Sequence, residues 1–281
     1  MLILSSILTA IDVLISKLYQ KSNGDSLKSG LKFNFFVGLF SSIIFLALNK
    51  FRLQITLYSC IWAFIMTALA VAFIIIGFNI LSCGKTAYYT FFRMTGAMII
   101  PYIWGLFFLN EEFSAPRLVG LILIILSILI INSDKTNISL KSLLLCIIVF
   151  FLAGFVNIIS KQHSINIHAV SHTDYIILTS FAKIILCGIL LFFVKEAPHK
   201  NPKSNTYILI LCALSACLTG VAYMLQLISA KYTPATLLFP IITGGTIIFS
   251  AIFARIFFKE KISKKSFLSI IICFIGTCMF I

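Results

Sequence analysis

The chain has 281 residues, of which 60% are hydrophobic and 11% charged, and its net charge is +14. Typical soluble chains carry about 25% charged residues, which form their polar coat. The composition therefore excludes a soluble globule and indicates a protein surrounded by lipid. The cations stand in short gaps between apolar runs and form no continuous basic stripe, which argues against nucleic-acid binding.

Ten apolar segments follow one another along the chain, and a membrane-crossing helix needs roughly 20 apolar residues. The first contains Asp12 and has no basic leading region, so we interpret it as a retained helix rather than a signal peptide. The runs are too long and too uniform for a transmembrane β-barrel. The sequence predicts an all-α integral membrane protein with ten transmembrane helices, at residues 2–18, 33–48, 58–81, 87–109, 118–131, 140–160, 175–194, 207–229, 236–258 and 267–281.

Cysteine and histidine spacing gives no metal or redox motif. The eight cysteines are scattered without a C-x-x-C pair, so we interpret them as small hydrophobic residues. His163, His168 and His172 stand at a spacing that is not typical of zinc, and we expect a solvated loop there. No nucleotide-binding loop is present. We therefore expect no metal, no cofactor and no ATP-driven motor.

The chain is predicted to be an internal duplication, with repeats at 1–136 and 137–281. A shift of 149 residues places Gly96 on Gly245 and the phrase Phe-x-x-Glu-x-x-Ser at 108–114 on the same phrase at 257–263. A shift of 144 residues places Ile-Ser-Lys at 15–17 on Ile-Ser-Lys at 159–161. Because five helices is an odd number, the second copy enters the membrane from the opposite side. Such inverted repeats are common in secondary transporters, whose substrate site lies between the repeats near the midplane.

Ten helices, two repeats of five, and the phrase that contains Glu111 in one half and Glu260 in the other resemble the drug/metabolite transporter superfamily. The most similar branch is the ten-helix EamA-like transporters. This resemblance covers the whole chain and implies a membrane transporter, either a monomer or a homodimer. It implies a substrate among amino acids, sugars, nucleotide sugars, cations and drugs. We expect a multi-pass protein of the plasma membrane, the inner membrane of a bacterium.

Charged residues inside apolar segments are candidates for function, because a charge at the bilayer centre costs about 3 to more than 10 kcal/mol. Asp12 lies roughly 15 Å along the first segment and shares one helical face with Ser5, Thr9 and Ser16. Asp12 could carry a proton or pair with a cationic group of the substrate. Lys183, central in the seventh segment, could bind a carboxylate or phosphate. Alternatively, the two charges form a structural ion pair.

Arg93 in the fourth segment follows an aromatic stretch that contains Tyr89. Arginine makes bidentate contacts with carboxylates and phosphates, although from this depth it could also reach the membrane interface. Single polar residues in later segments complete the predicted site. The predicted substrate-binding set is Asp12, Tyr89, Arg93, Asn157, Lys183 and Tyr223.

Helix breakers inside two segments are predicted hinges: Pro101 in the fourth, and Pro240, Gly244 and Gly245 in the ninth. Proline frees a backbone carbonyl, which in a transporter can line a site or permit flexing. The alternative is a tolerated kink, with glycines that only allow close packing.

The predicted function is a secondary transporter that moves a small metabolite, such as an amino acid or another anionic or zwitterionic solute, by alternating access. A proton is the expected coupling ion. The alternatives are a proton-coupled exporter of organic cations or drugs and, less favoured, a multi-pass membrane enzyme. Orientation stays open: 15 of the 22 cations flank the segments on the side away from the termini, which places that side in the cytoplasm. The resemblance implies the opposite orientation.

Overall fold

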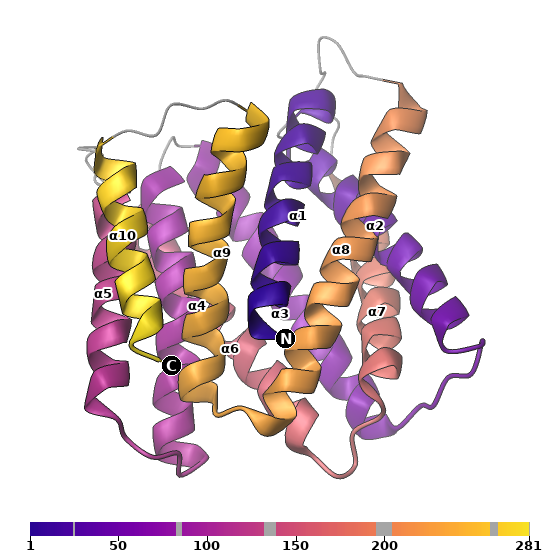
Figure 1. Cartoon of the computed structure of the whole chain (residues 1–281). Helices are drawn as coiled ribbons and strands as arrows, with labels where there is room; N and C mark the ends of the chain where they lie inside the picture. Colours follow the sequence, from indigo (N-terminus) through magenta and orange to yellow (C-terminus); the bar gives the residue numbers. More distant parts are fainter. Residues whose placement is uncertain (25, 83–85, 132–138, 195–203, 259–263, 281) are drawn as a thin grey trace.

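The computed structural model describes residues 1–24, 26–82, 86–131, 139–194, 204–258 and 264–280 (Figure 1). Within these ranges there are ten helices and no strand, which confirms the predicted all-α class and the number of helices. Eight of them are long and apolar enough to cross a membrane, whereas α5 and α10 have 17 and 15 residues. The helices are α1 (Leu2–Asn23), α2 (Leu27–Leu48), α3 (Leu57–Ser82), α4 (Thr86–Phe108), α5 (Ala115–Ile131), α6 (Leu140–Ile165), α7 (His172–Phe193), α8 (Asn205–Tyr232), α9 (Ala235–Phe258) and α10 (Lys264–Cys278).

The first two helices extend beyond the apolar segments that predicted them. α1 continues to Asn23 rather than ending at residue 18, and α2 begins at Leu27 rather than at residue 33. α1 stops at Gly24, whose φ of 85° lies in the region that glycine adopts readily. α2 starts after Ser26, whose side chain accepts a hydrogen bond from a backbone N–H of the first turn. Capping residues, rather than the end of the apolar run, therefore set these helix ends.

Two groups of three helices form the centre of the bundle. α1 packs against α8 and α9, and α6 packs against α3 and α4. We call these the α1 group (α1, α8, α9) and the α6 group (α3, α4, α6). Each group combines helices from both halves of the chain. α2 and α7 pack against each other. α2 also contacts α8 of the α1 group, and α7 contacts α3 of the α6 group. α5 and α10 form a pair at one edge of the bundle (Figure 1).

Consecutive helices run in opposite directions, so α1 begins and α10 ends toward the same side of the bundle (Figure 1). We call this the terminal side. We call the opposite side the basic side, because Lys17, Lys21, Lys28 and Lys32 surround the turn between α1 and α2. These two names locate the site without assigning either side to the cytoplasm.

Glycines allow α4 and α6 to approach each other closely. A Cβ atom added at Gly96 would lie 2.1 Å from the carbonyl oxygen of Phe150. One added at Gly154 would lie 2.3 Å from Cβ of Ile100. Small residues commonly permit such close packing of membrane helices. The crossing of α4 and α6 therefore holds the α6 group together.

Replacing Gly96 with alanine should destabilise the protein, because the new methyl group would push α6 away from α4. Overpacking of this kind costs about 1–3 kcal/mol. Thermal unfolding of the purified protein in detergent measures the effect. Gly30 is the matched control, since a Cβ there meets nothing within 4 Å. Gly30→Ala should unfold at or slightly above the wild-type temperature, and equal stability of the two variants would contradict the packing argument.

Candidate functional site

A cavity of about 410 Å³ lies between the α1 group and the α6 group and reaches the surface at the turn between α1 and α2. We call it the basic-side cavity. Asp12 and Ser16 of α1 line one wall, and Phe73 of α3 with Arg93 of α4 lines the other. α2 contributes the remaining wall through its first two turns. The two helix groups are therefore separated on the basic side.

A second cavity of about 220 Å³ lies deeper in the bundle, between α2, α3, α7 and α8. We call it the deep cavity. Ala70 lines both cavities, so the two adjoin. Lys183 is the one charged residue among the described residues that line the deep cavity. The lining also carries six hydroxyl groups, those of Ser41, Thr67, Thr179, Ser180, Thr219 and Tyr223.

Three charged side chains meet at these cavities. The carboxylate of Asp12 accepts a hydrogen bond from Ser215 of α8 and interacts electrostatically with both Lys183 and Arg93. Arg93 lies over the ring of Phe73, with its guanidinium carbon 5.0 Å from the ring centroid. The ammonium group of Lys183 makes no hydrogen bond to any residue that the structure describes. The combined lining therefore carries one more positive than negative charge.

Five of the six predicted substrate-binding residues reach the cavities. Asp12, Tyr89 and Arg93 line the basic-side cavity, while Lys183 and Tyr223 line the deep cavity. Their role in binding stays a prediction.

Asn157 lies elsewhere, because its side-chain amide donates to the carbonyl oxygen of Ala97 at 2.7 Å and joins α6 to α4. Sequence reasoning missed Ser215, the direct partner of Asp12. Its spacing of one helical turn from Thr219 was the available signal.

The predicted hinge residues occupy two different kinds of position. Pro101 and Pro240 lie inside α4 and α9. A Cβ at Gly244 would meet the hydroxyl of Thr277 at 2.4 Å, and one at Gly245 would meet the hydroxyl of Ser6 at 2.7 Å. The two glycines therefore let α9 pack closely against α10 and α1. Flexing at the two prolines stays a prediction.

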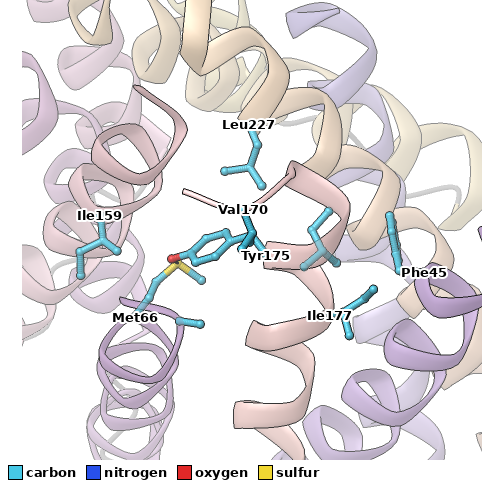
Figure 2. Packing of buried hydrophobic residues seen from close by; sticks show 9 residues of the cluster. Phe45, Met66, Ile159, Val170, Tyr175, Ile177 and Leu227 are labelled. Atoms are coloured by element: carbon cyan, nitrogen blue, oxygen red, sulfur yellow. The ribbon is translucent and has the colours of Figure 1, made fainter. Parts of the chain in front are cut away.

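A cluster of buried apolar residues packs beside the deep cavity, toward the terminal side (Figure 2). Met66 belongs to the cluster and also lines the cavity. The hydroxyl groups of Tyr175 and Tyr223 point at its sulfur, at 3.6 and 3.3 Å. Phe45 and Leu227 fill the cluster from α2 and α8. Among the described residues, this packed cluster thus lies between the deep cavity and the terminal side, whereas the basic-side cavity extends to the turn between α1 and α2.

His163 contradicts the expectation of a solvated loop. It lies within α6, which continues to Ile165, and it is 1% exposed. Its Nε2 atom lies 3.0 Å from the hydroxyl of Ser59, and its ring stacks on Tyr175 with 3.5 Å between centroids. Ser59 and the ring of Tyr175 contact the imidazole inside the bundle, whereas its Nδ1 atom has no hydrogen-bond partner among the described residues.

Comparison with known proteins agrees with this architecture. The family model of the EamA-like transporter family matches residues 140–281. A solved structure, described only as "Crystal structure of protein", superposes with a TM-score of 0.78 at 11% sequence identity. The superposition covers 99% of this chain and 94% of that one. At this identity the likeness shows the fold alone. No curated protein matches the chain significantly.

Proposed function

Because the chain belongs to the EamA-like transporter family, within the drug/metabolite transporter superfamily, we propose that it is a secondary transporter of an anionic or zwitterionic metabolite. Family membership and the apolar helices make it a multi-pass membrane protein of the transporter type. The observation that carries the substrate class is the ammonium group of Lys183 in the deep cavity, whose described lining otherwise combines hydroxyl groups with apolar side chains. We further propose that it works in a bacterial inner membrane, as a monomer or homodimer.

The deep cavity suits an acidic end group. Lys183 supplies a positive charge that would attract a carboxylate or a phosphate. The hydroxyl groups of Thr179 and Tyr223 donate to the carbonyl oxygen of Ile176 and to the sulfur of Met66, so they would turn to an anion by exchanging these contacts. An ammonium group inside a membrane protein is costly without an acceptor, which favours an anion at this position.

The opposite end of the substrate would face Asp12 at the junction with the basic-side cavity. There the carboxylate could take an amine or, in its absence, a proton. An organic cation would instead meet Lys183 and Arg93, whose combined charge exceeds that of Asp12. The two cavities together fall within the size range of typical small-molecule sites. An amino acid fits this distribution of charge.

Alternating access is supported by the way the helices pack. Each helix of one half has a counterpart five helices away in the other half, so that α1 corresponds to α6 and α3 to α8. Exchanging counterparts turns the contact α1–α8 into α6–α3, and the contact α1–α9 into α6–α4. The pairs α2–α7, α4–α9 and α5–α10 are unchanged by this exchange. Such a pattern is expected if the halves are inverted repeats. The repeat boundary at 136/137, together with Glu260 and Ser263 of the repeated phrase, lies outside the described residues.

In this mechanism the α1 group and the α6 group rock against each other around the site. The arrangement described here is open on the basic side and closed on the terminal side. Movement of the groups would close the first opening and create the second, with Pro101 in α4 and Pro240 in α9 as flexing points at different depths of the two helices. The substrate would stay between Asp12 and Lys183 throughout.

A proton-driven exporter of organic cations is the second candidate. It is favoured by one observation, the position of the Asp12 carboxylate on the wall of the open cavity. In that case Asp12 alone would bind the substrate, and protonation would release it. The two candidates differ in what they require of Lys183, which an anion needs and a cation does not.

Uptake into proteoliposomes tests the proposal. The panel contains labelled amino acids, dicarboxylates, sugar phosphates, neutral sugars and quaternary ammonium cations, each with and without a pH gradient. We expect accumulation of an acidic or zwitterionic member, above that in protein-free liposomes. Movement of organic cations alone would overturn the proposed substrate class.

A further inference from the structure

Lys161 holds the end of α8 on the terminal side. Its side chain comes from α6, is 5% exposed, and donates hydrogen bonds to two backbone carbonyl oxygens, of Ala230 at 2.6 Å and of Thr233 at 2.7 Å. One carbonyl lies in the last turn of α8 and the other on the residue that caps it, where no later N–H group of the helix is available to them. A buried cation thus satisfies the C-terminal end of this helix.

Glu111 holds the start of α9 in the complementary way. Its carboxylate, from the turn after α4, accepts hydrogen bonds from the backbone N–H of Ala235 at 2.5 Å and of Thr236 at 2.8 Å. These N–H groups belong to the first turn of α9 and likewise lack a partner within the helix. An anion thus satisfies the N-terminal end of this helix.

The two contacts meet at one place, because only residues 233 and 234 separate α8 from α9. A helix end carries partial negative charge at its C-terminus and partial positive charge at its N-terminus. The tip of the α8–α9 hairpin therefore presents both signs side by side. Lys161 and Glu111 match them, and the two side chains also attract each other electrostatically.

These contacts join the two helix groups. Lys161 lies on α6 and Glu111 follows α4, so both belong to the α6 group, whereas the hairpin tip belongs to the α1 group. They lie on the terminal side, where they hold the two groups together. On the basic side the same two groups stand apart around the cavity that contains Asp12 and Arg93.

We propose that Lys161 and Glu111 form a releasable latch on the tip of the α8–α9 hairpin, and that its release opens the terminal side of the transport route. The inference rests on the alternating access proposed above. Lys17 occupies the place in α1 that Lys161 occupies in α6, according to the repeated Ile-Ser-Lys, and it lies toward the basic side. The lysine of the repeated phrase thus lies on the central helix of each group, Lys17 on α1 and Lys161 on α6.

Gly105 of α4 provides room for the carboxylate. A Cβ atom added there would lie 2.6 Å from Oε2 of Glu111 and 3.2 Å from Cγ2 of Thr236. Gly105→Ala should therefore displace the carboxylate from α9 without changing any charge. This variant and Glu111→Gln disturb the same contact by different means.

Hydrogen exchange measured by mass spectrometry in lipid nanodiscs tests the latch without a substrate. Glu111→Gln and Gly105→Ala should each speed exchange at residues 233–238, where the released amides lie. Both should also slow exchange at residues 24–34, because rocking of the groups closes the basic-side cavity. Glu112→Gln is the matched control, since Glu112 is exposed beside Glu111, and it should change neither region.

Lys161→Met should give the same two-region pattern, whereas Lys231→Met, at an exposed lysine on the same helix end, should not. Faster exchange at 233–238 with no change at 24–34 would mean a static helix cap and would overturn the proposal. If none of the latch variants folds, the contacts are structural rather than releasable, and the latch is rejected. A failed transport assay leaves this test intact, because no solute enters it.

Discussion

Replacing Lys183 with methionine should remove most of the uptake of the anionic or zwitterionic solute while leaving the protein folded. Methionine keeps the length and the apolar stem of lysine but removes the charge that the deep cavity offers to a carboxylate. A hydrogen bond to a charged group contributes about 1.5–3 kcal/mol, so uptake at low solute concentration should fall on the order of 10- to 100-fold. Initial rates in proteoliposomes measure this loss.

The matched control is Lys50→Met, at an exposed lysine in the turn between α2 and α3. It should transport at the wild-type rate. A thermal shift with the solute gives a second readout: wild type should be stabilised and Lys183→Met should not. Wild-type transport by Lys183→Met would refute the charge argument, and Asp12 would then be the sole binding group of a cation exporter.

Replacing Asp12 with asparagine should remove the dependence of transport on the pH gradient. The asparagine oxygen can still accept the hydrogen bond from Ser215, so the contact between α1 and α8 persists. What is lost is the group that can take up and release a proton at the junction of the two cavities. Wild-type accumulation should grow with an inward proton gradient, whereas the variant should equilibrate the solute without accumulating it.

Uptake at several imposed pH gradients, with counterflow of preloaded solute as the second assay, separates these outcomes. Counterflow needs no driving ion, so Asp12→Asn should retain it. Glu112→Gln serves again as the exposed carboxylate control and should keep the wild-type pH profile. An unchanged profile in Asp12→Asn would assign the coupling to another group.

The polar face of the first segment illustrates how far the sequence could predict the site. Periodicity alone placed Ser5, Asp12 and Ser16 on one face that avoids lipid. In the structure, Asp12 and Ser16 line the basic-side cavity, but Ser5 is fully buried and donates to a carbonyl oxygen of α8. Helical spacing identifies the face, whereas the partner of each residue depends on which helix lies opposite.

The latch residues were missed for the same physical reason. Glu111 and Lys161 interact with backbone groups more than 60 residues away in the chain, and no side-chain pattern marks those groups. Both residues nevertheless stand in phrases that recur in the second half or the first. The lysine and the glutamate that recur in these phrases were therefore the available signal, but the phrases alone do not show which backbone groups the two charges contact.

The pair formed by α5 and α10 has a consequence for the membrane around the protein. A Cβ atom added at Gly120 would lie 2.6 Å from the carbonyl oxygen of Gly276, so the two backbones touch where these helices cross. No lipid chain can enter between helices that pack this closely, and lipid therefore meets the pair only along its outer faces. Those faces carry large exposed apolar side chains, such as Ile122 of α5 and Phe274 of α10. The pair thus separates the cluster behind it, which includes Ile124 and Cys273, from the hydrocarbon.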